Sequence, residues 1–354
     1  MHKVKLYSIG KEKAGMKYSI LIPVYNVKPY IRQCLESVLM QKIQDYEVIM
    51  VNDGSTDGSE KICEDFVERD SRFQLIHQKN MGLLIARRTA IKEAKGSYFM
   101  FLDSDDFWEP DTLEVVDENI ELLHPDILIF NFQKYHSDGT VVQREPILQN
   151  YEKFDYSNKN KYVLKWLQVP DLNAMWTKVV KRECVDVENG YSKYEGLSSG
   201  EDCLQSIYFV KTADSIFYID KAIYNYRVNY SSISFTYKPQ KIEQLHQVKG
   251  ELFSYISEYF PEDTEIKTAF WNLYGINLGS SLLDLFSNLD TETVRQWIKY
   301  VNRQELFQKM LSQPTMPQIS TFYKMLISIV KSEHVISGVL LGKCFRVYKK
   351  IRRK

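Results

Sequence analysis

The sequence predicts an α/β protein whose core is a doubly wound, mostly parallel sheet with helices on both faces, followed by a helical C-terminal region. Three observations support this prediction. Over the first third of the chain, short and continuously apolar strand patterns alternate with helical patterns, as in a parallel sheet that is covered on both faces. Acidic residues follow directly after two of these strands. Beyond Pro239 the apolar spacing is helical to the end.

The expected strands share an apolar composition rich in β-branched and aromatic residues. They lie at Tyr18–Val24, Tyr46–Val51, Phe73–His77, Tyr98–Leu102 and Ile127–Phe132. Helical spacing separates them, at Pro29–Met40, Ser59–Arg69, Leu83–Ala94 and Leu113–Leu123. The crossovers should be right-handed, and a ligand should bind beyond the carboxyl ends of the strands.

The middle of the chain has a looser pattern. We expect a polar, loop-rich stretch at 133–160 and a short helix at Cys203–Val210. A soft boundary near 235–240 then divides the chain into an N-terminal extension (1–16), an α/β domain (17–237) and a helical C-terminal region (238–354). Met16 is an alternative start of the chain.

Composition excludes several classes of protein. Lys plus Arg equals Asp plus Glu, 46 each, which gives no electrostatic case for nucleic acid binding. The five cysteines are scattered and never spaced as C-x-x-C, which favours a reducing compartment over a disulfide framework. No secretory signal and no apolar run of spanning length is present, so a cytoplasmic location is expected.

The strongest chemical signal is Asp103-Ser104-Asp105-Asp106, directly after a buried strand. Residues i and i+2 share one side of an extended chain, so Asp103 and Asp105 can address one hard cation. Mg²⁺ or Mn²⁺ prefers such oxygen ligands and can bridge a diphosphate, stabilising its charge as it leaves. The alternative is an acidic surface turn that caps the next helix, which the repulsion among three like charges disfavours.

Two further acidic signals are weaker. Asp53, in the V-N-D-G-S-T-D-G-S turn, can accept from the N–H edge of a base, although a plain turn also fits. Asp57 fits a capping box with Glu60. Asp202, in Gly200-Glu201-Asp202, can act as a general base for an acceptor hydroxyl, although it or Ser199 can equally cap the helix.

Two neighbouring arginines, Arg87 and Arg88, follow the loop at 80–82 and can reach a diphosphate, although a solvated helix edge explains them equally well. The chain has no G-x-G-x-x-G fingerprint and no Walker loop, which removes the two commonest nucleotide-binding interpretations of such a sheet.

Four ordered motifs together resemble the inverting glycosyltransferase family 2, which has a GT-A fold. They are YSILIPVYN (18–26), VIMVNDGSTDGS (48–59), NMGLLIAR (80–87) and YFMFLDSDDFWEPDTLE (98–114). The resemblance continues thinly through MWTKVV (175–180), SGEDCLQSIYF (199–209) and YNYRVNYSSIS (224–234). Asn52 stands where the family commonly has Asp, and Arg88 and Ala90 where it often has Asn and Gly.

The resemblance implies a role for each matched residue. Pro23, Tyr25 and Asn26 would line the nucleotide pocket, and Asp53 would contact the base. The D-x-D segment Asp103-Ser104-Asp105 would bind the ribose and the metal. The remaining assignments are Asp202 as general base with Glu201 as the alternative, Arg87 on the donor side, and Arg227 near the diphosphate or the acceptor.

The resemblance also implies a reaction. A metal-held nucleoside diphosphate, most often UDP, would leave in a single displacement as the acceptor hydroxyl attacks, which inverts the anomeric configuration. The acceptor would be a glycan or a lipid-linked hydroxyl, and the product a bacterial surface polysaccharide or glycolipid. Two rivals are a non-catalytic nucleotide-sugar or glycan-binding module and a nucleotidyltransferase, which would normally need a Gly-rich phosphate loop that PVYNVKPY lacks.

The C-terminal end has a distinct charge pattern. From His334 onward there is no acidic residue but there are seven basic ones: Lys343, Arg346, Lys349, Lys350, Arg352, Arg353 and Lys354. Apolar residues recur there at helical spacing: Ile336, Leu340, Cys344, Val347 and Ile351. Such a helix can lie on an anionic membrane surface, which would place the protein on the inner face of the cell membrane. The alternative is a packed terminal helix with a solvated basic tail.

Overall fold

The computed structural model describes residues 16–228 and 240–352, with side chains up to residue 347. The expected N-terminal extension and the boundary near 235–240 therefore lie largely outside the described residues, as do the side chains of the last five basic residues. Among the described helices, none is long and apolar enough to cross a membrane.

The strands form one mixed sheet in the order β3-β2-β1-β4-β9-β6-β10-β5, with β7 added to β6 and β8 to β10. Their bounds are β1 Tyr18–Val24, β2 Tyr46–Asn52, β3 Phe73–His77, β4 Tyr98–Phe101, β5 Phe107–Trp108, β6 Ile127–Tyr135, β7 Val141–Gln143, β8 Lys153–Asp155, β9 Lys178–Lys181 and β10 Ser215–Arg227. Strands β3, β2, β1 and β4 are parallel, as the sequence predicts.

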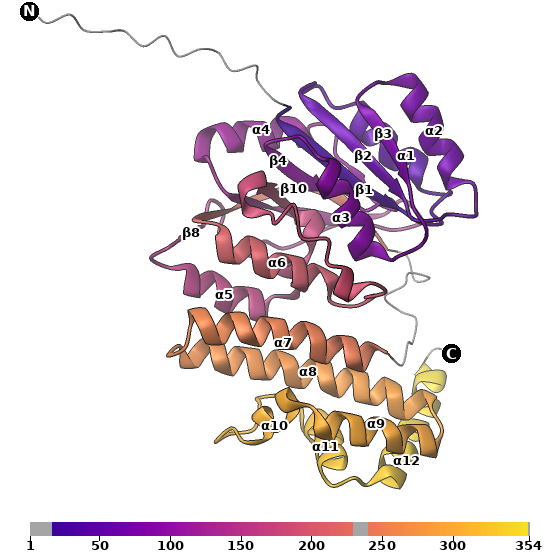
Figure 1. The fold of residues 1–354 in the computed structure, drawn as a ribbon, viewed down its shortest axis with the longest axis vertical. Coiled ribbons are helices and arrows are strands. Elements are labelled where there is room, and N and C mark those ends of the chain that lie inside the picture. The colour runs from indigo at the N-terminus through magenta and orange to yellow at the C-terminus, as the bar shows by residue number, and fades with distance from the viewer. Residues whose placement is uncertain (1–15, 229–239, 353–354) are drawn as a thin grey trace, which may run out of the picture.

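The helices complete the α/β part and build the C-terminal region (Figure 1). Those of the α/β part are α1 Ile31–Leu39, α2 Ser59–Arg69, α3 Leu83–Glu93, α4 Thr112–Leu123, α5 Lys159–Gln168 and α6 Glu201–Thr212, with 3-10 turns at Pro170–Asn173, Met175–Thr177, Arg182–Cys184 and Ser192–Tyr194. The C-terminal helices are α7 Lys241–Tyr259, α8 Thr264–Asn288, α9 Thr291–Arg303, α10 Glu305–Leu311, α11 Thr321–Lys331 and α12 Val335–Arg352.

Side chains along each strand point alternately to the two faces of the sheet, so the sheet contributes to two apolar cores, one on each face. In β1, Ile20 and Ile22 pack in one apolar cluster with residues of α1, α2 and α4, whereas Leu21 packs in a second cluster with α3, α5 and α6. Because neighbouring strand residues point to opposite faces, a strand that is apolar at every position needs cover on both sides. The predicted doubly covered sheet is therefore confirmed.

The C-terminal helices extend the second core rather than forming a separate one. Helices α7 and α8 lie along α5 and α6, and α9–α12 lie on the far side of that pair (Figure 1). The helix α12 approaches α8 closely at Gly342, where any side chain would meet the backbone of Phe286. The predicted helical C-terminal region is confirmed over the described residues.

Two local predictions differ from the structure. Strand β9 runs antiparallel between β4 and β6, so the sheet is less uniformly parallel than the apolar runs suggest. The stretch expected to be loop-rich, 133–160, contains the end of β6, the strands β7 and β8, and the start of α5. Both strands are only three residues long, too short for an alternating pattern to be recognised.

Candidate active site

Strand topology brings the predicted acidic residues to one edge of the sheet. Strands β1, β2 and β4 are parallel neighbours and end at Val24, Asn52 and Phe101. The segments that follow them carry Tyr25, Asp53 and Asp103. This is the edge at which an open α/β sheet binds ligands.

The first loop after β1 is tied to the turn after β2. Pro23 is buried opposite Val51, whereas Tyr25 is 42% exposed. Asn26 adopts a left-handed conformation, with φ of 53°, and its side-chain oxygen accepts from the amide of Thr56 at 2.8 Å. An exposed aromatic ring beside a fixed turn suits a base-stacking surface.

Asp53 is buried and anchors the loop before α3. Its carboxylate accepts hydrogen bonds from the Gln78 side chain at 2.7 Å and from the amides of Met81 and Gly82, each at 2.9 Å. One of its oxygens, Oδ2, receives only one of these bonds. The geometry thus supports the turn interpretation and leaves a single acceptor position for a base.

Asp57 has a structural role, as the turn interpretation predicts. Its carboxylate accepts from the amides of Lys28 and Ser59, at 2.9 and 3.0 Å, and these bonds lower its pKa together with the bond from the Ser59 hydroxyl. The capping box expected with Glu60 is wrong, because Gly58 caps α2 and makes no side-chain bond. A left-handed φ of 91° at that position explains the glycine.

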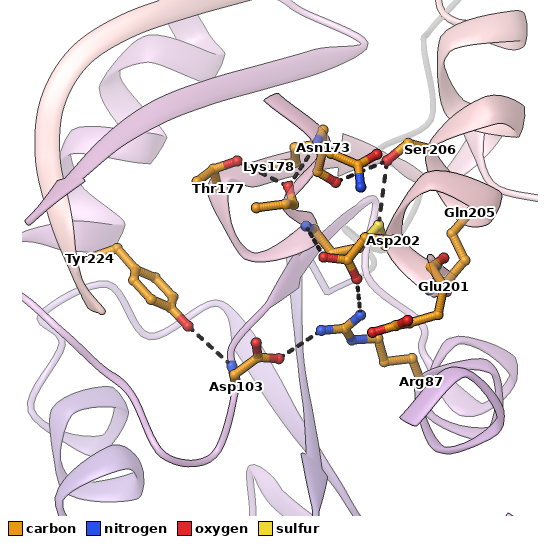
Figure 2. Close-up of polar contacts among 12 residues, drawn as sticks. Arg87, Asp103, Asn173, Thr177, Lys178, Glu201, Asp202, Gln205, Ser206 and Tyr224 are labelled. Atoms are coloured by element: carbon orange, nitrogen blue, oxygen red, sulfur yellow. Dashed lines mark hydrogen bonds and ion pairs between the residues drawn. The ribbon is translucent and has the colours of Figure 1, made fainter. Parts of the chain in front are cut away.

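Arg87 joins two acidic motifs that are far apart in the sequence. Its Nη2 donates to Asp103 Oδ1 at 2.7 Å, and its Nη1 donates to Asp202 Oδ1 at 2.5 Å (Figure 2). Its side chain is only 1% exposed, so the interpretation as a solvated helix edge is wrong. The alternative that Asp202 or Ser199 caps α6 is also wrong, because Gly200 caps that helix without a side-chain bond.

Arg88 is likewise buried but serves the local fold. It donates to the backbone carbonyls of Asp186 and Asn189, and its guanidinium lies 4.8 Å from the ring centroid of Tyr191. Its bonds therefore go to the 186–191 segment and not to the acidic cluster.

The D-x-D segment ends in the half-buried Asp105 and is followed by the buried Asp106, and the two carboxylates have different surroundings. The carboxylate of Asp105 accepts no hydrogen bond from another residue in the described part of the chain, and burial, then the charge of Asp103, raises its pKa to about 6. Asp106 accepts from the Tyr224 hydroxyl and from the Arg227 amide, each at 2.7 Å. Burial raises the pKa of Asp106 well above its usual range.

Arg227, the last residue of β10, contacts the D-x-D segment from the strand that pairs with β5. Its Nε donates to the backbone carbonyl of Asp105 at 2.8 Å, and its Nη2 donates to Gln33 at 2.6 Å. Three aromatic rings lie within 5.4 Å of its guanidinium carbon, those of Tyr30, Phe107 and Tyr135.

Two more ionisable groups lie beside Asp202, the half-buried Glu201 and the buried Lys178. Burial raises the pKa of Glu201, and the Asp202 charge adds to this effect, while one Glu201 oxygen has no partner. Lys178, in β9, donates to the carbonyl of Ala174, and burial lowers its pKa to about 7. Met175, in the turn before β9, points its amide at Asp202 Oδ2, at 3.4 Å.

Sequence reasoning missed three residues of this site. Asp106 was visible in the acidic run but had no assigned role, whereas Tyr224 and Lys178 lie in the thinly matched motifs YNYRVNYSSIS and MWTKVV. Only the fold shows that the Tyr224 hydroxyl accepts from the Asp103 amide and that Lys178 lies near the charge of Asp202 (Figure 2). Within the described chain, no group of three or more His, Cys, Asp or Glu residues has the arrangement of a metal cluster.

Comparison with known proteins identifies the chain as a glycosyltransferase. The family model described as glycosyl transferase family 2 matches residues 19–181. The uncharacterized glycosyltransferase EpsJ of Bacillus subtilis is 30% identical over 267 residues, which is 73% of this chain and 70% of EpsJ. The chain belongs to glycosyltransferase family 2.

Other similarities agree with this assignment. Glycosyltransferase GlyA of Streptococcus pneumoniae is 27% identical over 83% of this chain, although the chain spans only 43% of the length of GlyA. Among solved structures, residues 1–349 of Staphylococcus aureus TarS in complex with UDP-GlcNAc superpose with a TM-score of 0.67. That match covers 94% of this chain and 92% of TarS 1–349 at 20% identity, which shows a shared fold.

Proposed function

We propose that this glycosyltransferase transfers one sugar from a UDP-sugar to a glycan or lipid-linked hydroxyl, with inversion at the anomeric carbon. One observation carries the proposal: Asp103 of the donor-side motif and Asp202 of the G-E-D motif meet on one buried arginine. Two carboxylates from separate motifs at the ligand-binding edge provide the two functions that a single displacement needs, donor binding and deprotonation of the acceptor.

A divalent cation fits the residues at the D-x-D segment. The Asp105 carboxylate is half-buried, accepts no hydrogen bond from another described residue and lies near the charge of Asp103, and a bound cation would stabilise its ionised form. Asp105 would bind Mg²⁺ or Mn²⁺, and Asp103 would bind the ribose or share the metal through its oxygen that does not contact Arg87. A bound cation would stabilise the negative charge of the departing diphosphate.

The protein's own groups divide the remaining work. Asp202 accepts the proton of the attacking hydroxyl, and the bonds from Arg87 and the Met175 amide fix the orientation of its carboxylate. Glu201 is the alternative base, because burial raises its pKa to about 7, which is near the pH at which a general base works best. Tyr25, Asn26 and Asp53 bind the nucleoside, with Pro23 shaping the strand end beneath them.

A donor screen tests the proposal. Thermal unfolding would be followed against a panel of nucleotide sugars with Mn²⁺, with UDP-GlcNAc first because TarS binds it. A bound donor raises the melting temperature through mass action. Asp202→Asn should abolish release of UDP from the donor but keep the thermal shift, whereas Asp105→Ala should lose both. A donor that raises the melting temperature without any release of nucleoside diphosphate would favour the rival binding module.

We further propose that the outer face of α12 binds an anionic membrane surface, where a lipid-linked acceptor for a surface polysaccharide or glycolipid would lie. Ile336, Leu340 and Val347 are 69%, 58% and 58% exposed, although Val339 on the opposite face is buried. Lys343 and Arg346 are exposed beside these apolar residues. An apolar stripe flanked by cations is the pattern of a helix that lies in a membrane interface.

Vesicle binding tests this second proposal. Deleting α12 would remove its packing against α8, so point substitutions are preferable. Leu340→Asp should reduce co-sedimentation with vesicles that contain phosphatidylglycerol, whereas Ile276→Asp, at a 43% exposed position on α8, should not. Equal binding by both variants would contradict the proposal.

A further inference from the structure

Arg87 has the largest side chain among the fully buried residues of the described chain. It lies in α3, and its two carboxylate partners lie 16 and 115 residues away. Burying a guanidinium is costly unless charged partners satisfy it, so its burial requires both carboxylates.

We propose that Arg87 is a positioning residue that holds the donor-side Asp103 and the acceptor-side Asp202 in one fixed arrangement, and that it is not a direct ligand of the donor diphosphate. This inference rests on the proposed function, because it assigns those two sides to the two carboxylates.

The hydrogen-bond geometry separates these two roles. Each terminal nitrogen of Arg87 already donates to a carboxylate, and its Nε is buried without a partner. Figure 2 shows the guanidinium between the two aspartates, with Asp103 on one side and Asp202 on the other. The guanidinium has five N–H groups and these bonds use two, but the Arg87 side chain is only 1% exposed, so a phosphate could reach the remaining N–H groups only by displacing the residues packed around them.

The same geometry explains how the two carboxylates can work together. Arg87 takes one oxygen of Asp103 and one of Asp202, which leaves the second oxygen of each for other contacts. A planar guanidinium fixes the direction of both bonds, whereas a lysine ammonium is a point charge that cannot hold two carboxylates in a fixed geometry. The relative position of donor and base therefore depends on the two fixed bond directions of the planar guanidinium (the arginine fork) and not on the charge of Arg87 alone.

The test separates positioning from phosphate binding. Arg87→Lys keeps the charge and loses the fork. Its dissociation constants for UDP and for uridine, each with Mn²⁺, would be measured by calorimetry, and its kcat by release of UDP from UDP-GlcNAc with water as the acceptor. Arg88→Lys is the matched control, because Arg88 is a buried arginine of the same helix that bonds to backbone carbonyls and to no carboxylate.

We expect Arg87→Lys to lower kcat about 100-fold, which matches the loss of about 3 kcal/mol of transition-state stabilisation. The ratio of the UDP and uridine affinities should stay within about threefold of the wild-type ratio, because no phosphate contact is lost. Arg88→Lys should keep both kcat and this ratio. Melting curves would confirm that each variant is folded. Binding would then be measured at a temperature below the melting temperatures of both variants.

Two results would overturn the inference. A loss of UDP affinity of tenfold or more, with uridine affinity unchanged, would make Arg87 a direct ligand of the diphosphate. A kcat within threefold of the wild-type value would show that the fork has no role in the reaction. If the wild-type protein neither binds UDP nor releases it from UDP-GlcNAc, the proposed donor is wrong. This failure is distinguishable from failure of the inference, because it is seen in the wild-type protein before any variant is compared.

Discussion

Asp105 should reduce the stability of the metal-free protein, so that Asp105→Asn abolishes transfer and yet makes the fold more stable. The Asp105 carboxylate is half-buried, accepts no hydrogen bond from another described residue, and lies near the charge of Asp103. Its pKa rises from the ordinary value of 3.8 to about 6 for these reasons. Ionising it in the folded state is therefore less favourable than ionising it in the unfolded chain.

The size of the effect follows from this difference in pKa. A change of about 2 in pKa corresponds to about 3 kcal/mol, which is the expected gain in the free energy of unfolding when Asp105 becomes Asn. At pH 7 the carboxylate is ionised in both states, so the full gain is present. As the pH falls from about 6 to about 4, the folded protein takes up the proton first and the gain disappears.

Urea unfolding at pH 7 and at pH 4.5, without divalent cations, would measure both parts of this prediction. Asp103→Asn is the matched control and should destabilise the protein at pH 7, because it removes a carboxylate partner of the buried Arg87. An Asp105→Asn variant that is less stable than the wild type at pH 7, or a gain that does not change with pH, would refute the reasoning.

Three further predictions concern other parts of the structure. Mn²⁺ affinity measured by calorimetry should fall about tenfold between pH 7 and pH 5, because Asp105, with a pKa of about 6, must lose its proton to bind the ion; an equal affinity at both pH values would contradict this. Tyr224→Phe should cost about 1.5–3 kcal/mol in urea unfolding, because its hydroxyl donates to a buried carboxylate. Tyr226→Phe, whose hydroxyl makes no hydrogen bond within the described chain, should change stability by about 0.5 kcal/mol or less, and equal losses in the two variants would be inconsistent with the bond. Gly342→Ala should cost about 1–3 kcal/mol by overpacking α12 against α8, whereas Gly250→Ala, with open space around it, should stabilise α7 by about 0.5–1 kcal/mol; equal effects would argue against the close approach.

The first half of the sheet was predictable from the sequence because its strands carry their own signal. Strand β1 is buried at every position, and a seven-residue run that is apolar except at Ser19 is typical of a strand covered on both faces. The expected bounds of β1, α2 and β3 are those observed. Strand β9 gives no such signal, because it has only four residues, two of them lysines. Its antiparallel position depends on which neighbours it meets in the folded chain.

The site was predictable as a set of residues but not as a network. The carboxylates Asp103, Asp105 and Asp202 stand out because carboxylates follow a buried strand or open a helix, and the resemblance to a family assigns their roles. That Arg87 joins two of them depends on contacts across 16 and 115 residues, which no local pattern encodes. The C-terminal helix shows the same limit, because spacing predicts an amphipathic face without showing which face packs inward.

The antiparallel strand β9 has a consequence for how the chain folds during synthesis. It fills the place between β4 and β6, so the two halves of the sheet cannot join until residue 181 has left the ribosome. Strand β4 ends at Phe101 and β9 begins at Lys178, 77 residues later (178 − 101). Synthesis proceeds at about 5–20 residues per second, so the edge of β4 stays unpaired for roughly 4–15 s before β9 is made. During this interval chaperones or other β-strands can bind the unpaired edge.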